Sequence, residues 1–228
     1  MSPSIAVFGA GPGLGQALAR RYAQEGWTVW LVGRRPDPLN LLVKELTDGG
    51  SRAHALAADL SDLAAIPTLA KRIGPLDAFY YGLSAGGFTS ATNLTAEQFD
   101  RFVPLAMHTP IALVREFLPA MLDRGDGAIL TAQGGSAQRG LPNLSGPGPA
   151  IAAQRNYLQS LEGEVAGRGV YVGRLYIGAA IIGSAWHTEQ DNYTGPTVDP
   201  AYLAEQLWTM HSTRSPSEIK HPAAPAST

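Results

Sequence analysis

The chain has 228 residues, a formal net charge of −2 and no cysteine, with 45% hydrophobic and 16% charged residues. This composition is typical of a globular protein with a sizeable core. A slightly acidic chain without a long Lys/Arg run is not expected to bind nucleic acid. The lack of cysteine excludes disulfides, and the five histidines are too scattered to predict a metal site.

No apolar stretch reaches the roughly 18 residues of a membrane span, and no signal-peptide pattern opens the chain. We therefore expect a soluble, cytoplasmic protein with no membrane partner.

Short apolar runs that are typical of strands alternate with stretches that are typical of helices. Strands are expected at 5–8, 28–32, 53–56, 76–81, 128–131 and 170–177. Helices are expected at 14–25, 38–46, 63–73, 96–122, 150–166 and 201–210. Pro104 and Pro110 should kink the 96–122 segment or divide it into two shorter helices.

Continuous apolar strands that alternate with helices favour a parallel sheet covered on both faces, a doubly wound, Rossmann-like α/β fold. We expect one domain over 1–211, including a substrate loop near 183–198, and a flexible tail over 212–228 because this segment is rich in Pro, Ala and Ser. In such sheets ligands bind at the carboxyl ends of the strands.

A glycine-rich turn joins the first strand to the first helix. It contains Gly9, Gly11, Gly13 and Gly15, with Leu14 among them. Glycines allow a tight turn and close backbone approach, and the helix N-terminus offers N–H groups to a pyrophosphate. The pattern predicts a dinucleotide site, and the alternative is a turn with a structural role only.

Arg34 and Arg35 follow the second strand, where a site that prefers NAD usually has an acidic residue for the ribose hydroxyls. A guanidinium at this point favours the 2′-phosphate of NADP over NAD. The alternative is that both arginines are solvated charges at the end of a strand.

The spacing from Gly9 to Gly15, followed by Gly33-Arg34-Arg35 and by 58–62, resembles the short-chain dehydrogenase/reductase family over about residues 4 to 185. The resemblance implies that Asp59 binds the adenine amino group, that Leu60 packs beside the ring and that the backbone at Gly82 approaches the ribose. Asp59 could instead cap the next helix. Family members commonly pair through helices equivalent to 96–122 and 150–166, which implies a homodimer or homotetramer.

The same resemblance shows where the chain departs from the family. Members use a tyrosine acid/base, a lysine four residues later, a serine thirteen residues before the tyrosine and an asparagine on the preceding long helix. The register set by 161–172 places Pro147, Ile151 and Gly134 at the tyrosine, lysine and serine positions, with Ser136 the only near neighbour of Gly134 that could replace the serine. Aligning 99–101 with the start of the long helix of the family places Ala106 at the asparagine position. These side chains supply neither the proton nor the charge of the usual mechanism.

Three other side chains are candidates for a replacement acid. Tyr81 and Tyr176 end strands at the expected functional edge, and His187 lies in the loop expected to cover substrate. The alternative for the tyrosines is packing against helices. Adjacent Tyr80 and Tyr81 must point to opposite faces of the sheet, so only Tyr81 is taken as a candidate.

The sequence leaves three functions open. The first is an NADP-binding oxidoreductase that acts on a small organic carbonyl or alcohol by a non-standard proton route. The second is a cofactor-binding protein without redox turnover, serving as a sensor, scaffold or partner subunit. The third is a non-redox enzyme, an isomerase, cyclase or lyase, that uses the same cleft.

Overall fold

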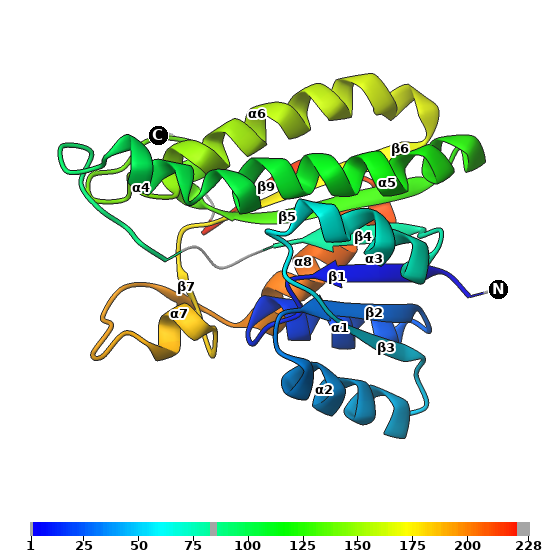
Figure 1. Cartoon of the computed structure of the whole chain (residues 1–228). Coiled ribbons are helices and arrows are strands. Elements are labelled where there is room, and N and C mark those ends of the chain that lie inside the picture. The colour runs from blue at the N-terminus through cyan, green and yellow to red at the C-terminus, as the bar shows by residue number, and fades with distance from the viewer. Residues whose placement is uncertain (1, 83–85, 223–228) are drawn as a thin grey trace, which may run out of the picture.

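A seven-stranded parallel sheet forms the centre of the molecule, in the order β3-β2-β1-β4-β5-β6-β9 (Figure 1). The computed structural model describes residues 2–82 and 86–222. The strands are β1 (Ser4–Phe8), β2 (Thr28–Gly33), β3 (Ala53–Ala57), β4 (Ala78–Tyr81), β5 (Gly127–Gly134), β6 (Val170–Ile177) and β9 (Glu218–His221). The predicted doubly wound α/β fold is confirmed.

Helices cover both faces of this sheet, which is why the strands carry apolar residues on both sides. The helices are α1 (Leu14–Gln24), α2 (Pro36–Asp48), α3 (Ile66–Ile73), α4 (Ala96–Asp100), α5 (Thr109–Arg124), α6 (Gly148–Val165), α7 (Ala185–Thr188) and α8 (Pro200–Thr213). One apolar cluster joins α1, α2 and α8 to the sheet, and a second joins α3, α5 and α6 to the opposite face.

Neither a membrane-spanning helix nor a metal-binding cluster is found among residues 2–82 and 86–222. None of their helices combines the length and the apolar character needed to cross a membrane. Among the same residues, no group of three or more His, Cys, Asp or Glu side chains is placed to hold a metal ion.

The segment predicted as one kinked helix is divided, as the two prolines suggested. A π-helical turn over Pro104–His108 lies between α4 and α5. Proline has no N–H to donate to the preceding turn, so a regular α-helix is interrupted there. Such wide turns recur at functional sites, and this one contains Ala106.

The predicted flexible tail is wrong for residues 212–221. Helix α8 continues to Thr213, and β9 pairs with β6, with Leu175 opposite Ile219. The sequence signal was weak because a four-residue edge strand with Glu and Lys shows no apolar run. Residues 223–228 of the expected tail lie outside the described part of the chain.

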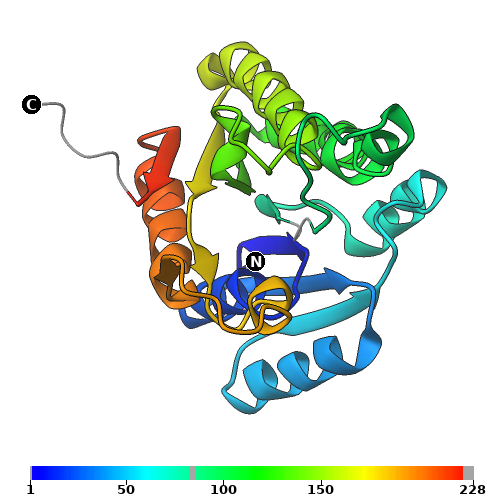
Figure 2. The same cartoon turned by 90° about the vertical axis from the view of Figure 1, so that its left-hand side faces the viewer.

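The expected substrate loop near 183–198 is closed at its base by two short parallel strands, β7 (Ala180–Ile181) and β8 (Thr197–Val198). Neither strand was predicted, since two residues carry no periodicity. Figure 2 looks at the end of the molecule that lies on the left in Figure 1, and shows this loop in front of α1.

Candidate functional site

The glycine turn after β1 has the backbone geometry that the sequence predicted. Gly9 and Gly13 have positive φ angles of 100° and 90°, which favour glycine. A Cβ at Gly15 would overlap the Gly9 carbonyl oxygen, whereas a Cβ at Gly11 would meet nothing within 4 Å. Gly15 therefore serves the packing of helix on strand, and Gly11 leaves open space beside the turn.

Helix α1 begins at this turn without a side-chain cap and without an acidic residue in its first turn. The helix N-terminus carries a partial positive charge and N–H groups that lack intrahelical partners. One side of the turn is covered by the substrate loop, since a Cβ at Gly13 would lie 3.1 Å from Ser184 Cβ and 3.3 Å from Ile181 Cγ2. The geometry suits an anion beside Gly11.

Arg34 and Asp59 lie at the same edge of the sheet, after β2 and β3. Both side chains are exposed, as is Arg35, which precedes α2. Asp59 accepts hydrogen bonds from the Ser61 backbone N–H (2.9 Å) and hydroxyl (2.7 Å). These two bonds, with a contribution from the positive charge of Arg34, lower the pKa of Asp59.

The suggested capping role falls to a different residue. Asp62, not Asp59, caps the next helical turn by accepting from the Ala64 N–H at 3.1 Å. Leu60 is buried in the cluster formed by α3 and α5, and its carbonyl oxygen accepts from the Thr109 hydroxyl. Its contact with an adenine ring stays a prediction.

Gly82 follows β4, and its N–H donates to the Phe8 carbonyl at 3.1 Å. A Cβ at this position would overlap the Tyr80 ring, so glycine is required for packing. Its approach to a ribose stays a prediction. The next residues of the loop, Leu83, Ser84 and Ala85, lie outside the described part of the chain.

Gly134, Pro147 and Ile151, which the resemblance assigns to the serine, tyrosine and lysine positions of the family, lie close together, and the Ile151 N–H donates to the Pro147 carbonyl at 3.0 Å. A Cβ at Gly134 would lie 3.7 Å from Ile151 Cδ1, so the end of β5 contacts the first turn of α6. Pro147 precedes the first residue of α6, which starts at Gly148, two residues before the expected start at 150. The assignment of these three residues to the catalytic positions of the family stays a prediction.

Ser136 is the hydroxyl nearest to this vacated site. A Cβ at Gly134 and a Cβ at Gly148 would each lie 3.7 Å from its Oγ. Ser136 is buried in the short helical turn that follows β5. Its hydroxyl therefore lies between the position of the missing serine and the start of the helix that carries the missing tyrosine.

Two buried glutamines under this site were missed by the sequence analysis. Gln154 on α6 donates to the Ala106 carbonyl at 2.6 Å, and Gln133 on β5 donates to the Gln154 side chain. The chain of amides ties β5 and α6 to the π-helical turn. Within the described residues, Gln133 Oε1 finds no hydrogen-bond partner. A glutamine in a strand or helix carries no pattern that names its partner, so no sequence signal pointed to this pair.

Tyr81 does not reach an open cleft. Tyr80 and Tyr81 point to opposite faces of the sheet, as predicted, and each is buried in the apolar cluster of its face. The Tyr81 hydroxyl donates to the Leu105 carbonyl in the π-helical turn, and burial raises the pKa of this phenol. The hydrogen bond to Leu105 and the raised pKa both argue against Tyr81 as a proton donor. The phenol instead supports the π-helical turn.

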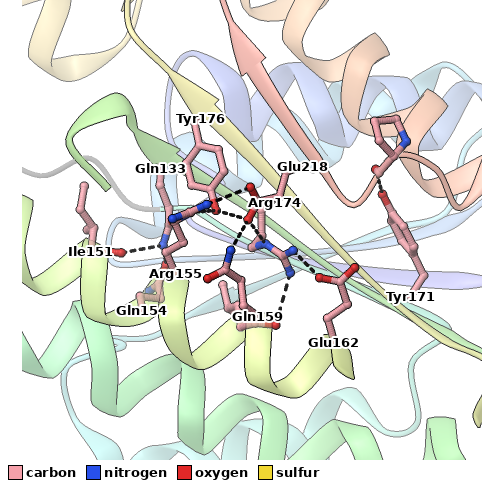
Figure 3. Close-up of polar contacts among 12 residues, drawn as sticks. Gln133, Ile151, Gln154, Arg155, Gln159, Glu162, Tyr171, Arg174, Tyr176 and Glu218 are labelled. Atoms are coloured by element: carbon pink, nitrogen blue, oxygen red, sulfur yellow. Dashed lines mark hydrogen bonds and ion pairs between the residues drawn. The ribbon is translucent and has the colours of Figure 1, made fainter. Parts of the chain in front are cut away.

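Tyr176 is also held in the interior. Its hydroxyl donates to Glu218 Oε1 at 3.1 Å and accepts from Arg155 Nε at 3.2 Å (Figure 3). Burial and the charge of Glu218 raise the pKa of Tyr176 to about 12. The side chain thus belongs to an ion-pair cluster between β6, β9 and α6, which also includes Arg174 and Glu162, and this argues against a catalytic role.

His187 is the candidate acid that lies on the substrate loop. It is half-buried on α7, where its N–H donates to the capping Ser184 hydroxyl at 3.2 Å. Its ring centroid lies 6.2 Å from that of Tyr193. Since Ser184 also contacts the glycine turn at Gly13, α7 lies beside the expected cofactor site. A role of His187 in proton transfer stays a prediction.

Comparison with known proteins agrees with this geometry. The model of the short chain dehydrogenase family matches residues 3–190. The fatty acyl-CoA reductase Rv0547c of Mycobacterium tuberculosis is 30% identical over 222 residues, which cover 92% of this chain and 74% of that protein. The chain belongs to the short-chain dehydrogenase/reductase family.

Solved structures share the fold. A short-chain dehydrogenase from Streptomyces avermitilis superposes with a TM-score of 0.83 at 24% identity, covering 96% of this chain and 88% of that one. An NADPH-bound short chain oxidoreductase from Pseudomonas aeruginosa, described as containing an atypical catalytic center, gives 0.85 at 20% identity, covering 99% and 98%.

Proposed function

We propose that this protein is an NADP-dependent oxidoreductase that interconverts a small organic carbonyl compound and its alcohol without the usual serine, tyrosine and lysine. The observation that carries the proposal is the intact glycine turn. It combines the open space at Gly11 with the uncapped start of α1, in a chain that belongs to the short-chain dehydrogenase/reductase family.

The residues present fit the cofactor. The α1 N-terminus and the turn from Gly9 to Gly15 would hold the pyrophosphate, and Arg34 would bind the 2′-phosphate. Asp59 would receive the adenine amino group, since the low pKa of its carboxyl keeps it ionised and able to accept. When bound, NADPH supplies a hydride for the substrate carbonyl carbon.

The chain itself would orient the carbonyl group. We assign this role to Ser136, whose Oγ lies 3.7 Å from a Cβ at Gly134 and 3.7 Å from a Cβ at Gly148, the residue after Pro147. A hydrogen bond from Ser136 Oγ to the carbonyl oxygen stabilises the negative charge that develops there. The oxygen then takes up a proton, and His187 on α7 is the candidate donor.

A second candidate function is cofactor binding without turnover. The observation that favours it is the meeting of Gly134, Pro147 and Ile151 where three catalytic side chains are expected. Positioned acid/base groups contribute about 10²- to 10⁴-fold to such reactions, so their loss leaves binding intact and chemistry slow.

The test is a calorimetric titration of the purified protein with NADPH and, separately, with NADH. We expect micromolar binding of NADPH and weaker binding of NADH. Arg34→Ala should weaken NADPH binding by about tenfold or more, because a hydrogen bond to a charged group is worth about 1.5–3 kcal/mol, and should leave NADH binding unchanged. Arg72→Ala, an exposed arginine on α3, is the control.

Turnover separates the candidates. The oxidoreductase is supported if the protein oxidises NADPH with simple aldehydes and ketones, and if this rate falls in Ser136→Ala and recovers in Ser136→Thr. Tight NADPH binding with no oxidation across the same panel favours the binding protein. If neither nucleotide binds, both candidates fail and the cleft serves a non-redox reaction.

Assembly of the chain is a separate proposal. Pairing through α5 and α6, the helices through which the family commonly associates, would give a homodimer or homotetramer. Light scattering coupled to size-exclusion chromatography measures the mass, and a monomer contradicts the proposal.

A further inference from the structure

Aromatic side chains from two loops meet at the carboxyl edge of the sheet. Phe88 lies in the β4–α4 loop, and Trp186 and Tyr193 lie in the substrate loop. The Trp186 ring contacts both of the others edge to face, with centroid distances of 6.3 Å to Phe88 and 5.3 Å to Tyr193. Phe88 is 40% exposed, and Ile182 of the same loop as Trp186 is 47% exposed. We call Phe88, Trp186 and Tyr193 the aromatic cover.

The aromatic cover is attached to both halves of the candidate site. On one side, Gly87 packs so closely on Gly146 that a Cβ at Gly146 would overlap the Gly87 carbonyl, and Gly146 directly precedes Pro147. On the other side, Ser184 at the start of α7 lies against Gly13 in the glycine turn. The three rings therefore bridge the vacated catalytic positions and the expected nucleotide site.

These loops offer little positive charge to a ligand. Residues 82–95 contain no charged side chain, and Arg139 is the only one in 134–147. Residues 178–199 contain Glu189, Asp191 and Asp199 and no Lys or Arg. These three segments together carry three carboxylates and one guanidinium, so their net negative charge disfavours an anionic substrate.

Aromatic rings with exposed edges and faces bind apolar and aromatic groups by burial of area and edge-to-face contact. We propose that the aromatic cover binds the apolar part of an uncharged substrate, an aldehyde or ketone with an aryl or alkyl group, with Trp186 as the central contact. The reduction of that carbonyl group rests on the proposed function. Binding of the uncharged compound does not.

The test compares acetophenone with 4-acetylbenzoate, which share the ring and the ketone and differ by one carboxylate. Ligand-observed NMR on the full chain, with and without saturating NADPH, measures the dissociation constant without requiring turnover. Trp186→Ala and Phe88→Ala are compared with Tyr202→Ala, which removes an exposed aromatic ring (49%) on α8 that packs beside His221 of β9, with a centroid distance of 5.2 Å. Circular dichroism checks that each variant folds.

We expect acetophenone to bind at least tenfold more tightly than 4-acetylbenzoate. Trp186→Ala and Phe88→Ala should each weaken acetophenone binding by about threefold to tenfold, in line with about 0.5–1.5 kcal/mol per aromatic pair. Tyr202→Ala should have no effect.

Equal binding of the two ketones, no binding of acetophenone, or unchanged binding in both folded cover variants would each overturn the proposal. The proposed function fails separately. If acetophenone binds and NADPH is not oxidised, the ligand class stands and the redox activity does not. If NADPH is oxidised by other carbonyl compounds while acetophenone does not bind, the redox activity stands and the ligand class is wrong.

Discussion

The guanidinium of Arg174 on β6 donates a hydrogen bond of 3.0 Å to the carboxylate of Glu218 on β9. Arg174 is only 1% exposed and also pairs with Glu162 on α6. Arg155 on α6 donates to the second oxygen of Glu218 at 3.1 Å (Figure 3). A short, charged edge strand is thus fixed to the sheet by ion pairs in addition to its backbone pairing with β6 and the packing of Ile219.

We expect Glu218→Gln to lower the free energy of unfolding by about 2 kcal/mol. Glutamine keeps the shape of the side chain but removes the charge that faces two guanidinium groups, one of them buried. Because the carboxylate is 26% exposed, the loss should be smaller than for a fully buried pair. Urea denaturation measures it, and Lys220→Gln, an exposed change on the same strand, is the control. Equal stability of the two variants contradicts the structural role of the pair.

The strands of the central sheet could be predicted because each is set by the hydrophobic pattern of its own short segment. The buried parallel strand β1 has a continuous apolar run over 5–8, and its bounds, Ser4–Phe8, agree with the predicted 5–8 to within one residue. Strand β9 is stabilised by Arg174 and Arg155, which lie 44 and 63 residues away in the sequence. No local pattern records a contact over that distance.

The candidate site could be predicted in part. The backbone geometry of the glycine turn depends on the spacing of its glycines, which is visible in the sequence. The empty catalytic positions also rest on spacing, and they stay a prediction. The side-chain partners of Tyr81 and Tyr176 are not visible in the sequence, because each is set by tertiary packing. The sequence placed both tyrosines at strand ends correctly, but their hydroxyls point to a backbone carbonyl and to an ion cluster in the interior.

His211 on α8 predicts an acid-sensitive stability. Its ring is buried and its Nδ1 lies 2.7 Å from the Tyr22 hydroxyl. Burial, with a smaller contribution from the charge of Arg214, lowers the pKa of His211 from 6.5 to about 4, against the opposing charges of Asp126 and Asp77. The folded state therefore favours the neutral ring, and the unfolded state binds the proton first as pH falls.

The contribution of neutral His211 to the free energy of unfolding should be complete above pH 6.5. The free energy of unfolding should fall by about 3 kcal/mol as pH drops from 6.5 to 4. Glu218, whose pKa is lowered by Arg155 and Arg174 despite burial, loses its contribution only below about pH 4.5. The window from pH 6.5 to 4.5 thus isolates the histidine. Urea denaturation across it measures the slope. In His211→Gln, which cannot titrate, the slope should be largely lost, and a slope equal to that of the native chain contradicts the assignment.

Two alanine substitutions in the glycine turn should separate folding from cofactor binding. Gly15→Ala places a methyl group on the Gly9 carbonyl oxygen, so we expect a clear loss of thermal stability. Gly11→Ala meets no atom within 4 Å, so the fold should keep its melting temperature. The methyl group then fills the open space beside the turn, and NADPH affinity should fall by tenfold or more.

Melting curves and calorimetric titration of both variants check this pair. The assignment is wrong if Gly11→Ala binds NADPH like the native chain, because the open space would then lie away from the cofactor. A loss of stability in Gly11→Ala equal to that in Gly15→Ala would show that the turn is needed for folding alone.

Restoring the missing side chains should restore the usual chemistry. The triple variant Gly134→Ser, Pro147→Tyr, Ile151→Lys places a hydroxyl, a phenol and an ammonium at positions that already meet in space. The nearest atoms to a Cβ at Gly134 are 3.7 Å away, which is ordinary contact, and Ile151 is only half-buried, so a lysine head group can reach water. The positive charge beside the phenol lowers its pKa.

We expect the triple variant to reduce acetophenone about 10²- to 10⁴-fold faster than the native chain, as positioned acid/base groups do. NADPH oxidation followed at 340 nm measures the rate, and the matched control is the double variant Gly134→Ser, Ile151→Lys, which lacks the phenol. A triple variant that folds and binds NADPH but is no faster than this control would mean that the register placing Pro147 at the tyrosine position is wrong. A gain that depends on the phenol would support the register that places Pro147 at the tyrosine position.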